Sequence, residues 1–456
     1  MNEVFEISGL WWLPDKPDSK IGGVLKFNPE KETRLELIGT FNNLKEDLNK
    51  LVLIDIINGI SSDGEEITLH RCFEVNLHFS SGFPISFYNC GTIFVGAHFK
   101  NISNIKFNTI YINYSNLDQW VNIDGFDISQ QPSGESIIKY KRPETIRTII
   151  NDELDILISF SLKGPNLNCV QRETRIEQTT HIGIKFSEEK HINEFRKFIF
   201  IIQNFLSLAV GSSVNPLSIS GYKSGNQQVK IFYRLINATD KISILNPHEM
   251  LFTFKDISTR FEYIIKNWID KAELLKPVSN LYFGTKYNSR MYLEHQFLSI
   301  MQALESYHGR IMNNNETPAP EFEEKKRKII DSAPCEYKNW LSYKLEHSNQ
   351  PHLRKRLEDI CIMFESTVNE FILDRTNFIN DAANTRNYLT HYDSRLKDKS
   401  ARNEELYNII KKLQLLAELC LLKEIGFSLK ELNEIYSKYE IKRKYLSNKE
   451  LNLGTN

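Results

Sequence analysis

The chain has 456 residues, of which 41% are hydrophobic and 25% are charged, and its formal net charge is −1. This composition is typical of globular proteins and excludes a strongly basic chain that binds nucleic acid over its whole surface, so any RNA contact needs a local basic patch. A chain of this length is longer than a single hydrophobic core usually serves, so two or three domains are expected.

The cysteines and the N-terminus indicate a cellular setting. The six cysteines are far apart: Cys72, Cys90, Cys169, Cys335, Cys361 and Cys420. No CxxC pair indicates zinc and no spacing is typical of a disulfide framework, so we expect no metal, no cofactor and a reducing cytoplasm. The start, MNEVFEISGLWW, lacks a basic segment followed by an apolar run, and no signal peptide is expected.

Residues 1 to about 245 are predicted to be rich in strands. Segments such as TRLELIGTF, EITLHRCFEVNLHF, LDILISFSL and QVKIFYRL alternate or are rich in β-branched and aromatic residues, with Gly, Asn, Asp and Pro between them. The most apolar stretch, residues 197–210, is too short to span a bilayer and contains Gln203 and Asn204, so it predicts a buried helix and no membrane contact. A second helix is expected at about 255–272. We therefore expect a β-rich region over 1–280, with a further division into subdomains at about 1–130 and 131–280 as one option.

The character of the chain changes to helical after KPVSNLYFGTKYNS, residues 276–289. Apolar residues at steps of three and four predict four amphipathic helices, at 290–310, 353–372, 375–391 and 403–425. Gly426 predicts the end of the last one. Four such helices predict an all-α bundle over 285–435, followed by a C-terminal tail, 436–456. The polar segment NNNETPAP, residues 313–320, is expected to be a mobile loop.

Arg386 and His391, within NTRNYLTHYD, form an Arg-x(4)-His pair near the end of the third predicted helix. Chance alone gives roughly one pair with four to six intervening residues in such a chain, so spacing does not single this one out. The sequence contains the pairs Arg71/His78, Arg175/His181, Arg290/His295 and Arg386/His391. Arg386, however, interrupts the apolar stripe of Phe378, Ala382 and Leu389, and a charged residue there needs a partner. One interpretation is a structural arginine paired with a carboxylate such as Glu305; the other is a functional site.

Two parts of the sequence resemble known families. The motif RNYLTH, late in a four-helix unit whose first helix contains MQALES, resembles the HEPN family, whose hallmark is Arg-x(4–6)-His, commonly with Asn after the Arg. The segments ISGLWWLP, IGGVLKFNP and RLELIGTF resemble the β-rich N-terminal domain of ApeA-type anti-phage proteins. The resemblance covers nearly the whole chain and implies an α+β multidomain fold, with a β-rich half followed by an all-α HEPN helical bundle.

The resemblance also implies an activity: a metal-independent endoribonuclease of abortive infection, in which two HEPN domains pair around a shared cleft. Carried over by position, Arg386 and His391 are catalytic and Asn387 orients the site. Glu305 and Tyr392 are our own additions as supporting residues. The implied partners are host RNA, with transfer RNA as the candidate substrate, and a second copy in a homodimer or higher even oligomer. The N-terminal region is expected to sense a phage-derived protein or peptide.

This chemistry suits these residue types. Metal-free RNA cleavage needs a base for the ribose 2′-OH, which a histidine supplies near neutral pH, and a permanent cation for the charge that builds on the phosphoryl oxygens. On a regular helix Asn387 and His391 lie about 40° apart, whereas Arg386 and His391 lie about 140° apart. Either the helix ends before His391, or the working Arg and His come from two chains.

Other candidate binding residues carry two interpretations each. Downstream of the pair, SRLKDKSAR supplies Arg395, Lys397 and Lys399, which either contact phosphates or belong to a solvated loop. The run LRKR, residues 353–356, has the same two interpretations. The tryptophans Trp11, Trp12 and Trp120 form either a ligand surface or, as strand aromatics more often do, part of a core.

Two rivals to a nuclease remain open from sequence. The first is a non-catalytic HEPN dimer that binds RNA or protein, with the β-rich region as a ligand-binding module. The second is a carbohydrate- or peptide-binding β module with a helical dimerisation unit. An RNA cleavage assay in the presence of EDTA separates the nuclease from both.

Overall fold

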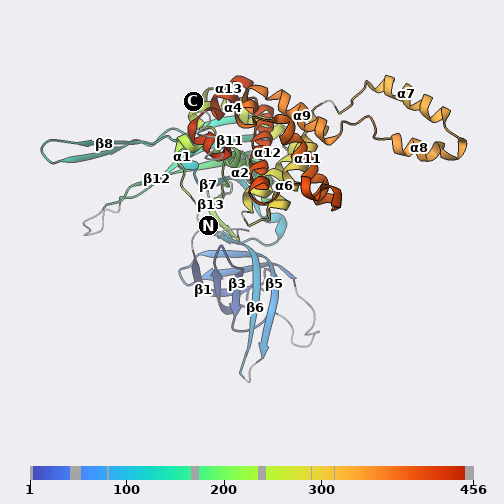
Figure 1. Ribbon diagram of the computed structural model, residues 1–456. Helices are drawn as coiled ribbons and strands as arrows, with labels where there is room; N and C mark the ends of the chain where they lie inside the picture. The colour runs from blue at the N-terminus through green and yellow to red at the C-terminus, as the bar shows by residue number, and fades with distance from the viewer. Residues whose placement is uncertain are drawn as a thin grey trace. The chain divides into compact units, whose positions relative to one another are not determined.

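The computed structural model describes residues 4–41, 53–79, 82–165, 174–234, 243–288, 290–312 and 314–446. The chain forms two compact units. The first comprises residues 1–210, 214–247 and 252–262, and the second comprises 211–213, 248–251 and 263–456. Figure 1 shows strands in the N-terminal half of the colour range and helices in the C-terminal half. The predicted fold class, a β-rich half followed by a helical bundle, is therefore confirmed.

The first unit is built on antiparallel strands. They are β1 Phe5–Trp12, β2 Ile21–Phe27, β3 Thr33–Leu37, β4 Leu53–Ser61, β5 Glu66–Phe79, β6 Pro84–Val95, β7 Lys106–Tyr114, β8 Phe126–Gln130, β9 Ser136–Tyr140, β10 Ile146–Asn151, β11 Leu154–Lys163, β12 Glu177–His191, β13 Pro216–Tyr222 and β14 Gln228–Tyr233. Strands β8 and β9 form a separate hairpin, and the other twelve join one sheet in the order β10-β11-β12-β7-β13-β14-β6-β3-β2-β1-β4-β5.

The first six strands close on themselves, because β5 also pairs with β6. Their inward side chains fill the interior. In β3, Thr33, Leu35 and Leu37 are buried while Arg34 is exposed, which is the two-residue period of a strand with one face in a core. Trp11 lies in this core with no exposed surface, packed among residues such as Leu25, and its ring lies directly against Gly59. A Cβ at Gly59 would be 2.2 Å from that ring, so only glycine fits opposite the indole.

The optional division of the N-terminal region at about residue 130 is wrong. Strand β7 precedes that point, yet it pairs with β12 and β13, which follow it. Strand β14, in turn, returns to pair with β6 through Lys230↔Val95 and three further positions. Strands from both halves of the region thus share one hydrogen-bonded ladder, and the contacts group them into one unit.

Helix α2, Ile192–Val210, covers one face of the second half of the sheet. It contains the apolar stretch that predicted a buried helix, and its residues Phe195, Ile199 and Leu206 are buried. Tyr114 of β7 donates a hydrogen bond to the carbonyl of Ile199 at 2.9 Å, which fixes the helix on the sheet. Within the described ranges, no helix combines the length and apolarity that a membrane crossing requires.

The tryptophans belong to the core, as strand aromatics usually do. Trp12 is buried, and Trp120, on the short helix α1 Leu117–Val121, has no exposed surface. Its indole N–H donates to the carbonyl of Phe252 at 3.1 Å, and its ring packs against Phe205 and Phe254, the latter at the start of α3, Phe254–Ile257. The hypothesis of an exposed tryptophan ligand surface is wrong.

The second unit is helical. Its helices are α4 Phe261–Asp270, whose residues from Tyr263 on belong to this unit, α5 Ala272–Tyr287, α6 Leu293–Ile311, α7 Ala319–Ser332, α8 Lys338–Leu345, α9 Leu353–Met363, α10 Glu365–Phe371, α11 Arg375–His391, α12 Asn403–Glu424, α13 Leu429–Tyr436 and α14 Tyr439–Tyr445. The four predicted helices are present as α6, α9 with α10, α11 and α12. The second of them is interrupted at Phe364, whose backbone leaves the helical region. Helix α6 packs against α5, α9, α11 and α12.

The predicted domain limits need two corrections. The β-rich unit ends at Glu262 rather than at 280, because α4 and α5 pack with the helical unit: Lys271 forms an ion pair with Glu424 at 2.8 Å. The segment 276–289, after which the helical part is predicted to begin, is already helical, because α5 extends to Tyr287. At the other end, α14 lies inside the expected tail, and its Tyr445 is buried in the bundle, so residues 436–446 are part of the helical unit.

Helices α7 and α8 form a hairpin that projects from the rest of the helical unit (Figure 1). Neither helix has a buried residue, and Trp340 and Tyr343 of α8 are exposed. The expected loop at 313–320 is shorter than predicted, because α7 begins at Ala319, and Asn313 lies outside the described residues. The backbone N–H of Thr317 donates to Oδ1 of Asn349 at 2.9 Å, and Nδ2 of Asn349 donates to the backbone carbonyl of Thr317 at 2.8 Å. These two hydrogen bonds tie the segment to the base of the hairpin.

Candidate functional site

Helix α11 positions the Arg-x(4)-His pair. Asp374 caps its N-terminus by accepting a hydrogen bond from the backbone N–H of Asn377 at 2.9 Å. The side chains of Phe378 and Ala382 are buried against the bundle, and Arg386 follows Ala382 by four residues, one turn further along the same face. Because Arg386 lies on the same face as these buried residues, its guanidinium lies at the edge of the core, where it is half-buried.

Glu305 of α6 is the partner of Arg386. Its two carboxylate oxygens lie 3.3 Å from Nε and 3.4 Å from Nη2 of Arg386, so the two planar groups face each other as a fork. The Arg386 and Glu305 side chains are 31% and 25% exposed, which leaves solvent access to the pair. Arg386 Nη1 also donates to Oδ1 of Asn387 at 3.3 Å. The contact with Glu305 that one of the two interpretations of Arg386 expects is present, and Asn387 lies where it can orient the guanidinium.

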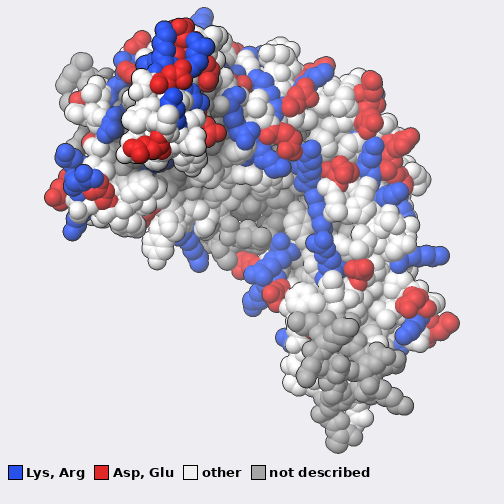
Figure 2. Space-filling model, turned by 90° about the vertical axis from the view of Figure 1, so that its right-hand side faces the viewer, with Lys and Arg blue, Asp and Glu red and all other residues white. Residues whose placement is uncertain are grey.

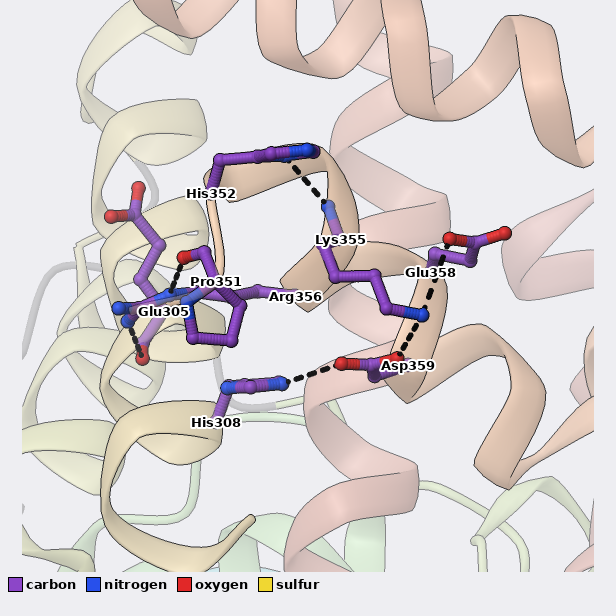
Figure 3. Close-up of polar contacts among 8 residues, drawn as sticks. All are labelled: Glu305, His308, Pro351, His352, Lys355, Arg356, Glu358 and Asp359. Atoms are coloured by element: carbon purple, nitrogen blue, oxygen red, sulfur yellow. Dashed lines mark hydrogen bonds and ion pairs between the residues drawn. The ribbon is translucent and has the colours of Figure 1, made fainter. Parts of the chain in front are cut away.

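Two further arginines surround this pair. Arg356 of α9 donates from Nη1 to the backbone carbonyl of Glu305 at 3.3 Å and from Nε to the carbonyl of Pro351 at 2.8 Å (Figure 3). Arg354 donates to the side-chain oxygens of Asn380 and Asn384 on α11 at 3.0 and 2.8 Å. The run LRKR is thus not a free basic surface, because its arginines tie α9 to α6 and α11.

His391 is the last residue of α11 and is exposed. The explanation that the helix ends before His391, which would bring the two side chains together, is therefore wrong. Five residues on a regular helix separate Arg386 and His391 by about 140° around the axis and about 7.5 Å along it. Asn387 and His391, four residues apart, share a face. Within one chain, Arg386 thus faces the bundle edge while His391 faces solvent.

Tyr392 closes the helix. It adopts a left-handed backbone conformation, with φ 51°, and its N–H donates to the carbonyl of Tyr388 at 2.6 Å. The residue is 72% exposed, and its ring meets the ring of Tyr388 edge to face at 5.7 Å. An exposed tyrosine next to His391 offers a flat surface on which a nucleobase can stack.

The predicted basic run forms a 3-10 helix, Ser394–Lys399, directly after Tyr392. Arg395 is exposed and pairs with Asp393 at 2.7 Å, and its hydrogen bonds lower the pKa of Asp393 to about 2. The charge of Arg395 is therefore largely balanced within the segment. Lys397 and Lys399 are exposed on the same short helix. On the face drawn in Figure 2, acidic and basic side chains are interspersed, so a phosphate contact would depend on such local cations.

A polar chain next to Glu305 was not foreseen from the sequence. His308, one turn after Glu305 on α6, is fully buried and its Nε2 lies 3.0 Å from Oδ2 of Asp359, while Lys355 contacts the other oxygen at 2.9 Å (Figure 3). Burial alone would raise the pKa of Asp359, but the hydrogen bonds from Lys355 and His308 outweigh it and lower the pKa. This chain fixes α6 against α9 beside Glu305. Only the Lys355–Asp359 spacing of four residues hinted at it, since His308 occupies an apolar stripe.

Comparison with known families covers most of the chain. Residues 6–268 match the family model described as ApeA N-terminal domain 1, and residues 298–431 match the model described as Apea-like HEPN. The second match contains Glu305, the Arg386–His391 pair and the basic 3-10 helix. No curated protein and no solved structure matches the chain.

Proposed function

Because the chain belongs to the ApeA family and carries an Apea-like HEPN domain, we propose that it is a metal-independent endoribonuclease of anti-phage defence that acts by abortive infection. The observation that carries the proposal is the half-buried, solvent-accessible Arg386, held by Glu305 and followed on the same helix by the exposed His391. The proposed substrate is host RNA, with transfer RNA as the first candidate, in the cytoplasm. The proposed trigger is a phage-derived protein or peptide that the N-terminal unit senses.

In this mechanism the ribose 2′-OH attacks the adjacent phosphorus. His391 removes the hydroxyl proton as general base, and Arg386 stabilises the charge that builds on the phosphoryl oxygens. The bond between phosphorus and the 5′ oxygen breaks, and the leaving oxygen takes up a proton from solvent or from the protonated base, which gives a 2′,3′-cyclic phosphate and a 5′-OH. Asn387 and Glu305 act as positioning residues, because they hold the Arg386 guanidinium. Tyr392, Lys397 and Lys399 supply stacking and phosphate contacts to the strand, and Arg395 contributes less while it pairs with Asp393.

The first test is cleavage by the purified full chain in the presence of EDTA. We expect a labelled RNA to be cut at an unchanged rate with excess EDTA, because the proposed base and charge stabiliser are side chains. Mass spectrometry should find 2′,3′-cyclic phosphate and 5′-OH ends. A substrate with 2′-O-methyl groups at the cut sites serves as the control and should remain intact. Loss of cleavage with EDTA, or cleavage of the methylated RNA, would contradict the mechanism.

The splayed pair predicts a composite site in a dimer. If the working site takes Arg386 from one chain and His391 from another, light scattering at micromolar concentration should give at least twice the chain mass of 53.3 kDa. Mixing Arg386→Ala and His391→Ala proteins should then restore about one quarter of wild-type activity, because a symmetric dimer repeats the site twice and half of the dimers are mixed. A monomeric active enzyme, or no recovery after subunit exchange, rules out the composite site.

The alternative is a non-catalytic HEPN dimer that binds RNA or protein. One observation favours it: the Arg386–Glu305 pair is also the contact that a purely structural arginine would make. The two functions separate in the EDTA assay, since the alternative predicts RNA retention without new ends.

A further inference from the structure

The first unit contains a cavity of about 790 Å³ on the face of the sheet that α2 does not cover. Tyr114 and Phe186 contact α2, whereas Tyr111 of β7 and Lys185 of β12 line the cavity. Successive side chains of a strand point to opposite faces, which explains this division. The strands concerned, β11, β12, β7 and β13, are consecutive in the sheet. A volume of this size is typical of small-molecule sites.

The strand register sets the floor of this cavity. Tyr111 lies opposite Gly183 on β12 and opposite Ser220 on β13. A Cβ at Gly183 would lie 2.7 Å from the Tyr111 ring and 3.0 Å from Cβ of Leu157, so a side chain there would displace the ring. The absence of a side chain at Gly183 lets the Tyr111 ring lie across β12. The ring of Tyr222 meets it edge to face at 5.5 Å, and both tyrosines are half-buried.

The charged residues of the lining are all cationic. Arg142, between β9 and β10, and Lys185 line the cavity, and none of the described carboxylates does. Asp155, on the same face of β11, is paired outside the cavity with Arg147 at 2.8 Å. Lys223 also lines the cavity, but its ammonium lies over the Phe99 ring, 5.2 Å from the ring centroid, so Arg142 and Lys185 are the two cations assigned to a ligand. An unbalanced pair of cations in a concave site attracts anions.

Arg142 is partly fixed in place. Its Nε donates to the backbone carbonyl of Phe160 at 2.6 Å, and no described residue accepts a hydrogen bond from its terminal amino groups. His181, opposite Ser159 in the register, lies with Nε2 2.8 Å from Oγ of Ser161. Burial and the nearby Arg142 lower the pKa of His181, although Asp118 acts in the opposite direction. The imidazole is therefore a neutral hydrogen-bonding group at pH 7, beside the Ser159 and Ser161 hydroxyls.

From this combination we propose that the cavity binds a nucleotide: Arg142 and Lys185 contact the phosphate, the base stacks on Tyr111, and the hydroxyl and imidazole groups hydrogen-bond the sugar. Phosphate oxygens suit a guanidinium and an ammonium, and an aromatic face suits any base. A simple inorganic anion would contact the cations but has no ring that could stack on the two tyrosines. The proposal goes beyond the nuclease function and concerns the first unit alone.

The test is calorimetric titration of the full-length protein with AMP, adenosine and inorganic phosphate. We expect AMP to bind, and Arg142→Gln and Lys185→Gln each to weaken AMP binding by about tenfold, since each removes a charge-assisted contact. Tyr111→Leu should weaken AMP and adenosine binding together. Lys139→Gln, at an exposed lysine of β9, is the matched control and should bind AMP like the wild type. Melting curves check that each variant is folded.

Three results would overturn the proposal. These are no AMP binding up to millimolar concentration, undiminished binding in both charge variants, and inorganic phosphate binding as tightly as AMP. Because the readout is ligand binding, none of them bears on RNA cleavage, and failure of the nuclease assay leaves this test intact.

Discussion

Alanine at Arg386 or His391 is expected to lower the rate of RNA cleavage by at least about 100-fold, because each change removes a group whose contribution is made in the transition state. Arg386→Ala removes the only guanidinium that α11 presents to Glu305, and His391→Ala removes the proposed base. The readout is single-turnover cleavage of a labelled RNA at saturating enzyme, which separates chemistry from binding. Toxicity on expression should disappear in parallel.

The chain offers a matched control for this pair. Arg290 and His295 have the same spacing, and His295 is exposed at the start of α6. His295→Ala should cut RNA like the wild type. Arg386→Lys keeps the charge but loses the fork that faces Glu305, so it should fall between wild type and alanine. If His391→Ala or Arg386→Ala cleaves at the wild-type rate while remaining folded, the assignment of the pair is wrong.

Glu305→Gln tests whether Glu305 positions the arginine or only stabilises the fold. A positioning role predicts a lower cleavage rate at an unchanged melting temperature, because the amide cannot face the guanidinium with two acceptor oxygens. A purely structural role predicts the opposite pattern, with a lowered melting temperature and full activity.

The helices that could be predicted from sequence are those with a buried face. Steps of three and four residues, such as Phe297, Met301 and Leu304, mark α6 because one stripe of that helix lies in the core. Helices α7 and α8 bury no residue, so they leave no such stripe. Helix α5 contains Pro277, which argues against a helix locally, yet burial of residues such as Val278 and Phe283 outweighs that preference.

The pairing between distant strands of the β-rich unit could not be predicted from the sequence pattern. Alternation located individual strands, but the return of β14 to β6 and the position of β7 between β12 and β13 depend on register between distant segments. For the same reason Tyr111, Gly183 and Arg142 could not be grouped into one cavity beforehand. Arg386 differs, because its place in an apolar stripe requires a partner such as a carboxylate, and Glu305, one candidate named on that ground, is the residue it contacts.

Substitution of Glu418 is the second change for which we expect a large effect, in this case on the free energy of unfolding. It lies on α12 with no exposed surface, and three tyrosines donate hydrogen bonds to its carboxylate: Tyr282 of α5, Tyr436 of α13 and Tyr445 of α14. Lys286 lies 3.3 Å from the same group. Burial raises the pKa of all three phenols well above the ordinary value, so they remain donors. One carboxylate on α12 thus joins α5 to α13 and α14.

Glu418→Ala is expected to lower the free energy of unfolding by about 3–5 kcal/mol, because it leaves the Lys286 ammonium and three buried phenols without their shared acceptor. Glu418→Gln keeps the volume and one acceptor oxygen and should cost less. The measurement is urea unfolding of the full-length protein, followed by tyrosine fluorescence. Glu434→Ala, at an exposed residue of α13 that lies 3.9 Å from Lys430, is the control and should change stability by less than about 0.5 kcal/mol. If Glu418→Ala changes stability no more than this control, the tyrosines do not depend on the carboxylate, and the closure of the bundle by α14 rests on apolar packing alone.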